Sequence, residues 1–148
     1  MAQVTINPKT GAISVEGCDL TLERGRPISA VQTALTMFYR THIDHRNGYE
    51  WLAFHQLSFF GEPCALSVGF KDGALTEVHL GVALPNAPTK SGWPTREAIE
   101  QEICFVRSAL SKELSRSFSS GRENFSWGEV WSLFDPKGFM ASAGVRYA

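Results

Sequence analysis

The chain has 148 residues, of which 43% are hydrophobic and 11% aromatic, and its formal net charge is −1. This composition excludes a chain that is disordered throughout, because enough apolar side chains are present to build a core. The near-neutral charge excludes a global basic field for holding a polyanion, so we expect no nucleic-acid partner. The length predicts a single domain spanning residues 1–148.

The cysteines and the first residues bear on the cellular compartment. Cys18, Cys64 and Cys104 are odd in number and form no C-x-x-C pair, which indicates free thiols in a reducing compartment. Met1–Lys9 has no charged region followed by an apolar block, as a secretory signal would. No apolar run approaches the roughly 18 to 20 residues that span a bilayer. We therefore expect a cytoplasmic protein without membrane contact.

The first 24 residues alternate apolar and polar side chains and predict extended structure. The apolar positions at spacing two are Val4 and Ile6, then Ile13 and Val15. Between them, Asn7-Pro8-Lys9-Thr10-Gly11 predicts a hairpin connection, because proline fixes φ and glycine tolerates positive φ.

A first helix is predicted from about Pro27 to Tyr39, since proline suits the first helical turn. Its apolar stripe, at spacings of three and four, consists of Ile28, Val31, Leu35 and Phe38. The polar segment that follows, Thr41–Gly48, ends in Asn-Gly and predicts a loop or tight turn.

The middle of the chain predicts three antiparallel strands. Trp51–Phe60 is rich in aromatic residues, and the apolar residues of Leu66–Phe70 and Val78–Leu84 then alternate with other residues. Lys71-Asp72-Gly73 predicts a hairpin loop with glycine in the left-handed position. The alternation indicates one face against a core and another mostly outside it.

The segment Pro85–Pro94 contains three prolines and predicts a loop. Thr95 then suits the N-cap of a long amphipathic helix from Arg96 to about Phe118, lying on a sheet. The apolar stripe of this helix is Ile99, Ile103, Val106, Leu110, Leu114 and Phe118. If its site is buried, Ile103→Ala is expected to cost about 2 to 5 kcal/mol.

The last stretch predicts a C-terminal hairpin. Trp127, Glu129, Trp131 and Leu133 share one face of its first strand. Asp135-Pro136-Lys137-Gly138 matches a type I turn, and apolar residues alternate from Phe139 to Tyr147. The predicted fold class is α+β: a single antiparallel β-sheet of about six to eight strands, with one long amphipathic helix and one shorter helix packed on it.

Motifs of catalysis are missing from the sequence: there is no G-x-S-x-G, P-loop, Rossmann glycine fingerprint or H-E-x-x-H. We therefore expect no catalytic residues and no cofactor. His42, Asp44 and His45 offer metal-ligand chemistry, but zinc needs three or four ligands in fixed geometry. His55 and His79 would complete such a site only if the fold brought them close, so a polar loop is favoured and no metal is expected.

The tryptophans are the most informative candidates for contact with a partner. Trp93 lies in a predicted loop, and Trp127 and Trp131 lie on one predicted strand face. Tryptophan is enriched in binding hot spots because it presents a large rigid area with a polar group. Core packing is the favoured alternative for Trp127 and Trp131. The further candidate contacts, from the predicted loop, are His42, Asp44, His45 and Arg46.

Three stretches of the sequence together resemble a known kind of protein. They are Ile6-Asn7-Pro8-Lys9-Thr10-Gly11, the turn Lys71-Asp72-Gly73, and Phe125-Ser126-Trp127-Gly128-Glu129-Val130 through Asp135-Pro136-Lys137-Gly138. Their layout resembles small bacterial cytoplasmic immunity-type proteins of toxin–immunity systems. The resemblance implies a single α+β domain that works by binding another protein. No functional residue carries over, because the shared motifs are mainly turn chemistry.

The leading hypothesis is a non-catalytic protein-binding domain, in its specific form an immunity protein that neutralises a cognate secreted bacterial toxin by steric occlusion. One alternative is a small-ligand-binding protein or enzyme with a cavity between sheet and long helix, with His55, Glu77 and His79 at its mouth. Another is a structural or adaptor homodimer built through an exposed sheet edge.

Overall fold

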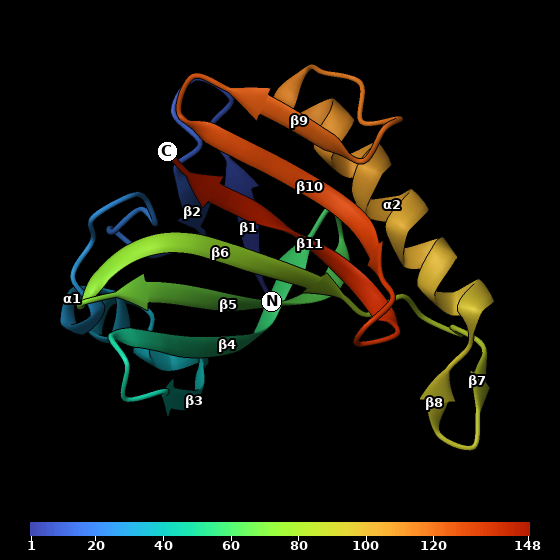
Figure 1. Cartoon of the computed structure of the whole chain (residues 1–148), viewed down its shortest axis with the longest axis horizontal. Coiled ribbons are helices and arrows are strands. Elements are labelled where there is room, and N and C mark those ends of the chain that lie inside the picture. The colour runs from blue at the N-terminus through green and yellow to red at the C-terminus, as the bar shows by residue number, and fades with distance from the viewer.

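The computed structural model describes all 148 residues and contains eleven strands and two α-helices (Figure 1). The longer strands are β4 (Tyr49–Phe59), β5 (Glu62–Lys71), β6 (Ala74–Val82), β10 (Gly128–Asp135) and β11 (Met140–Tyr147). The shorter strands are β1 (Ala2–Ile6), β2 (Ile13–Val15), β3 (Tyr39–Asp44), β7 (Thr89–Lys90), β8 (Trp93–Pro94) and β9 (Arg122–Phe125). The helices are α1 (Ile28–Ala34), the 3-10 turn η1 (Thr36–Phe38) and α2 (Arg96–Leu114).

Nine of the strands form one strongly curled sheet in the order β2-β1-β4-β5-β6-β11-β10-β9, with β3 paired to the first half of β4 (Figure 1). All pairs are antiparallel except β1 with β4, which run parallel. β7 and β8 form a separate small hairpin. The predicted α+β class with a large antiparallel sheet is confirmed in outline. The single sheet of six to eight strands is corrected to nine strands with one parallel pair, plus the second hairpin.

The N-terminal hairpin is confirmed, with Val4 opposite Val15 across β1 and β2. Its connection is fixed by residues from the other end of the chain. The Tyr147 hydroxyl donates to the Gly11 carbonyl at 2.7 Å. The Trp127 ring fills the space that a side chain at position 11 would need, and the Gly11 φ of 74° is one that glycine adopts without strain.

The segment after the first helix departs from the prediction in two ways. The predicted helix Pro27–Tyr39 is shorter, because Leu35 leaves helical geometry (φ −108°, ψ 22°) and only η1 follows. The predicted loop Thr41–Gly48 is wrong for its first half: Thr41–Asp44 belong to β3, which pairs with β4. All six residues of β3 are exposed, so the strand buries no apolar face against the core. Its geometry comes from its pairing with β4.

The strands β4, β5 and β6 and the hairpin of β10 and β11 follow the sequence pattern. The turn after β10 closes as expected, with Asp135 opposite Met140 and the Lys137 amide donating to Asp135 Oδ1 at 3.0 Å. The predicted loop Pro85–Pro94 is corrected in part, because it contains the β7–β8 hairpin with Lys90 opposite Trp93.

The long helix α2 begins as predicted. Thr95 Oγ1 accepts the Ala98 amide at 3.1 Å, as an N-cap should. The helix ends at Leu114, before the expected Phe118, because Ser115 adopts the left-handed conformation (φ 52°). Phe118 is nevertheless fully buried, beyond the end of the helix. α2 packs across β10, β11 and β1, and the core lies between this helix and the inner face of the sheet.

Candidate partner-binding surface

The face of the sheet opposite α2 carries a row of three aromatic rings from three strands. Trp51 on β4 contacts His79 on β6 edge-on, with ring centroids 5.0 Å apart, and His79 contacts Trp131 on β10 in the same way at 5.2 Å. The rings lie over two glycines. A Cβ at Gly69 would come within 2.9 Å of Trp51, and one at Gly144 within 2.9 Å of Trp131. The strand register therefore brings these three rings, which are far apart in the sequence, into one edge-to-face row.

Charged side chains cross the same face as a ladder through four strands. Arg146 lies 3.4 Å from Glu77 and 3.1 Å from Glu129, and Arg122 lies 3.0 Å from Glu129. The hydrogen bond from His79 to Glu77, at 2.7 Å, is the main cause that lowers the pKa of Glu77, and Arg146 acts in the same direction. Because these charges are paired within the sheet, the ion pairs hold the side chains of this face in place without giving it a strong net charge.

The structure places the three candidate tryptophans in different surroundings. Trp131 is only 6% exposed, and its Nε1 donates to Ser142 Oγ at 3.0 Å. Trp127 stacks on Phe125 with centroids 4.6 Å apart, and its Nε1 donates to the Pro8 carbonyl. Both rings thus serve the packing of the fold. Trp93, on β8, is 76% exposed.

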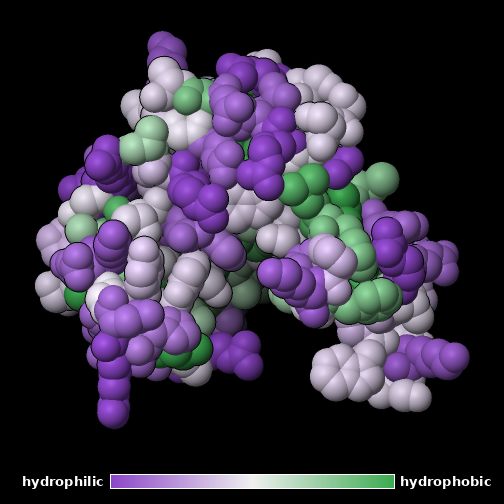
Figure 2. Space-filling view, viewed as in Figure 1, coloured by the Kyte–Doolittle hydropathy of each residue, from purple (hydrophilic) through white to green (hydrophobic).

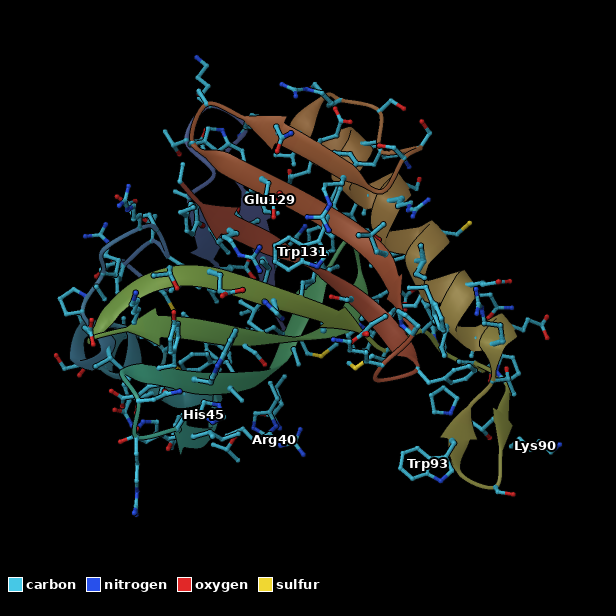
Figure 3. All side chains as sticks on the ribbon, viewed as in Figure 1. Arg40, His45, Lys90, Trp93, Glu129 and Trp131 are labelled. Carbon is cyan, nitrogen blue, oxygen red and sulfur yellow. The ribbon has the colours of Figure 1, made fainter.

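A hollow separates the β7–β8 hairpin from the arm formed by β3 and the start of β4 (Figure 2). Trp93 and Lys90 lie on the hairpin at one side, and Arg40 and His45 on the arm at the other (Figure 3). Two large hydrophobic residues, Phe139 in the turn after β10 and Met140 at the start of β11, are each 51% exposed. The hollow thus has exposed aromatic and apolar residues on one side and basic residues on the other.

An apolar groove of about 530 Å³ opens where β6 and β11 separate. The two strands pair only from Glu77 to His79, and beyond that point each continues with its other neighbour. The Val82 amide, left without a partner on β11, donates to Glu102 Oε2 of α2 at 3.2 Å. Burial in this groove raises the pKa of Glu102, and the hydrogen bond offsets the shift in part.

Replacement of Glu102 by glutamine is expected to raise the free energy of unfolding at pH 7. The raised pKa means that the folded chain binds the proton more tightly than the unfolded chain, so its stability increases as pH falls. Glutamine keeps an acceptor for the Val82 amide and removes the buried charge. The difference in the free energy of unfolding between the variant and the unaltered chain should therefore become smaller as the pH falls towards 4.5, the ordinary pKa of a glutamate. Urea unfolding at several pH values measures this. Glu100→Gln on the exposed side of α2 is the control, and an equal gain in that variant would contradict the prediction.

The remaining sequence candidates lie on or next to β3. His42 Nε2 lies 2.8 Å from Glu50 Oε2, and Asp44 Oδ1 accepts the Arg46 amide at 2.8 Å. His45 and Arg46 form the exposed bend that follows the strand. His42 and Asp44 face the same side of the β3–β4 pair, and no group of three or more metal-ligating side chains comes together anywhere in the chain.

The interior between the sheet and α2 is filled by side chains. The void that remains there measures about 10 Å³ and is lined almost wholly by hydrophobic residues, so it has no room for a small ligand. His79 and Glu77, expected at the mouth of such a cavity, lie on the opposite face of the sheet. No helix has the length and apolar character needed to cross a membrane.

The sequence reasoning missed several residues that shape these surfaces. Trp51, His79 and Arg146 are far apart in the chain and meet only through the strand order. The alternation of β4, with Leu52 and Phe54 buried, does predict that Trp51 faces away from the core. No local signal predicts its contact with His79.

The chain is thus an α+β domain with one long helix on the inner face of a curled sheet and a hollowed outer side. Its sequence matches no protein-family model and no curated protein. Its fold is similar to a chain in a solved structure of Rhs1-CT in complex with its cognate immunity protein RhsI1. The TM-score is 0.52 and the identity 12%, over 99% of this chain and 87% of that chain. The likeness confirms, at the level of layout, the resemblance seen in the turn motifs.

Proposed function

We propose that this chain is an immunity protein that neutralises a cognate secreted bacterial toxin in the cytoplasm by covering the toxin's active site. The observation that supports this most is the likeness of its backbone, over nearly its whole length, to a chain from a toxin–immunity complex. Its cysteines are free thiols, which suits a reducing compartment.

The hollowed side is the surface we assign to the toxin. Trp93 offers a large, rigid and mostly exposed side chain at one rim, and such residues dominate binding energy when a partner buries them. Phe139 and Met140 extend this rim towards the apolar groove. A toxin element that enters the hollow would bury these residues together, and the bulk of the domain would then block access to the toxin.

The proposal predicts that a toxin domain is encoded beside this chain, and that domain is the partner used to test it. The purified domain and chain are mixed, and complex formation and toxin activity are measured during titration. We expect a stable 1:1 complex and loss of activity at equimolar chain. Full toxin activity in molar excess of the chain, with no complex, would overturn the proposal.

Trp93→Ala is expected to weaken toxin binding by about 30-fold, the equivalent of about 2 kcal/mol. The fold should be unaffected because the side chain makes little contact within the chain. Met37→Ala is the matched control, since Met37 is 81% exposed but lies in η1, before β3. Calorimetric titration measures both variants. If Trp93→Ala and the unaltered chain bind the toxin with equal affinity, the β7–β8 hairpin is not part of the interface.

A further inference from the structure

The three free edges of the main sheet are protected to different degrees. The outer side of β2 is covered by Leu22, whose amide and carbonyl both bond to Ile13. At the edge strand β9, Arg116 donates to the Asn124 carbonyl at 2.8 Å and lies 3.7 Å from Glu123. β3 lies at the margin of the molecule with no element beyond it (Figure 1). An uncovered edge strand is a template for pairing with another strand.

Exposed hydrophobic side chains concentrate at this one edge. Of the eight large hydrophobic residues that are exposed, four lie on β3 or directly beside it: Met37, Tyr39, Ile43 and Tyr49. Ile43 is 53% exposed although it lies within a strand. Such a cluster on a free strand marks an interaction edge.

The backbone of β3 has groups directed away from its partner strand. The His45 amide bonds to the Tyr49 carbonyl across the hairpin at 3.0 Å. In an antiparallel strand, the backbone amide and carbonyl of successive residues point alternately to the two neighbouring strands. The amides and carbonyls of His42 and Asp44 therefore point away from β4, to the free side of β3.

We propose that β3 pairs antiparallel with β3 of a second copy of this chain, with His42 at the two-fold axis. The amide and carbonyl of each His42 then bond to those of the other. This inference goes beyond the proposed toxin binding and is tested on the chain alone, although the β3 arm that carries it also forms one side of the hollow.

The charges of β3 select this register. Arg40 has no partner within the chain, and only one carboxylate oxygen of Asp44 is used, by the Arg46 amide. With His42 on the axis, Arg40, just beyond the regular part of β3 in each copy, lies beside Asp44 of the other copy, which gives two ion pairs. If Ile43 were on the axis instead, Arg40 would face Arg46 of the other copy, and like charges would repel.

The shape of the strand limits how strong this dimer is. Arg40 is the extra residue of a β-bulge in β3, so backbone pairing is regular only from Thr41 to Asp44. The bulge and the long arginine side chain prevent the pairing from extending beyond Thr41. A stable interface buries about 1,600 Å² in total. An interface made by one short strand and the four apolar residues on or beside it buries less area than this. We therefore expect dimers that dissociate on dilution.

Sedimentation equilibrium of the chain alone tests the proposal. The apparent mass should rise from 16.3 kDa towards twice that value as concentration increases. Arg40→Asp should weaken the dimer at least tenfold, because it faces Asp44 with a like charge, and the double variant Arg40→Asp/Asp44→Arg should restore it. Arg46→Asp is the control, because it makes the same change of charge at a residue outside the paired part of β3, and it should have little effect on the dimer. A chain that stays monomeric at millimolar concentration, or a dimer indifferent to Arg40→Asp, would overturn the proposal.

A disulfide trap tests the register without relying on charge reversal at Asp44, which also supports the bend. Directly opposed residues with mutual backbone bonds have Cα atoms about 5.5 Å apart, within the range of a disulfide. In a Cys104→Ser background, which removes the exposed native thiol, His42→Cys should form a covalent dimer on mild oxidation, and Arg46→Cys should not. Equal yields from the two variants would contradict His42 at the axis, whatever the mass measurement shows.

Discussion

Leu110→Ala is expected to lower the free energy of unfolding by about 2 to 5 kcal/mol. Leu110 is 2% exposed, lies on the face of α2 that meets the sheet, and lines the small void in the core. Removal of its side chain enlarges this void, which the surrounding strands cannot refill without distorting their pairing. Urea unfolding followed by circular dichroism measures the change.

Ile103→Ala on the same helix is the comparison. Its expected loss in the free energy of unfolding is smaller than that of Leu110→Ala. Ile103 is half-buried, although Ile99 and Val106 before and after it in the stripe are buried. The sequence pattern treats Ile103 and Leu110 alike, whereas the packing does not. Equal costs in the two variants would contradict the position of α2 on the sheet.

Gly144→Ala is expected to destabilise the chain by about 1 to 3 kcal/mol, as overpacking of a filled site does. An added Cβ would lie 2.5 Å from the Val78 carbonyl oxygen and 2.9 Å from the Trp131 ring. The first contact strains the short β6–β11 ladder, and the second pushes Trp131 away from His79. Thermal unfolding and tryptophan fluorescence report the two effects separately.

Gly81→Ala serves as its control, because position 81 also lies within a strand but an added Cβ there meets nothing within 4 Å. Its free energy of unfolding should be unchanged or slightly higher, since alanine restricts the unfolded chain. A loss of stability equal to that of Gly144→Ala would show that the cost comes from the strand backbone and not from the contact with Trp131.

Local chemistry in the sequence determined the parts of the fold that depend on neighbours in the chain. The Thr95 cap, the turn at Asp135 and the alternation of β4 to β6 need only residues a few positions apart, so their patterns were read correctly. The turn motifs likewise indicated the overall layout, and the fold comparison supports them at that level.

Tertiary structure decided the elements whose partners lie far away in the chain. β3 is a strand because β4 supplies its hydrogen bonds, although its own residues read as a polar loop. Trp127 and Trp131 are packing residues because Gly11, Phe125 and Ser142 receive them, and Trp93 is left exposed because its hairpin lies beyond the sheet. Strand pairing and burial are properties of two or more segments at once, so a pattern within one segment does not contain them.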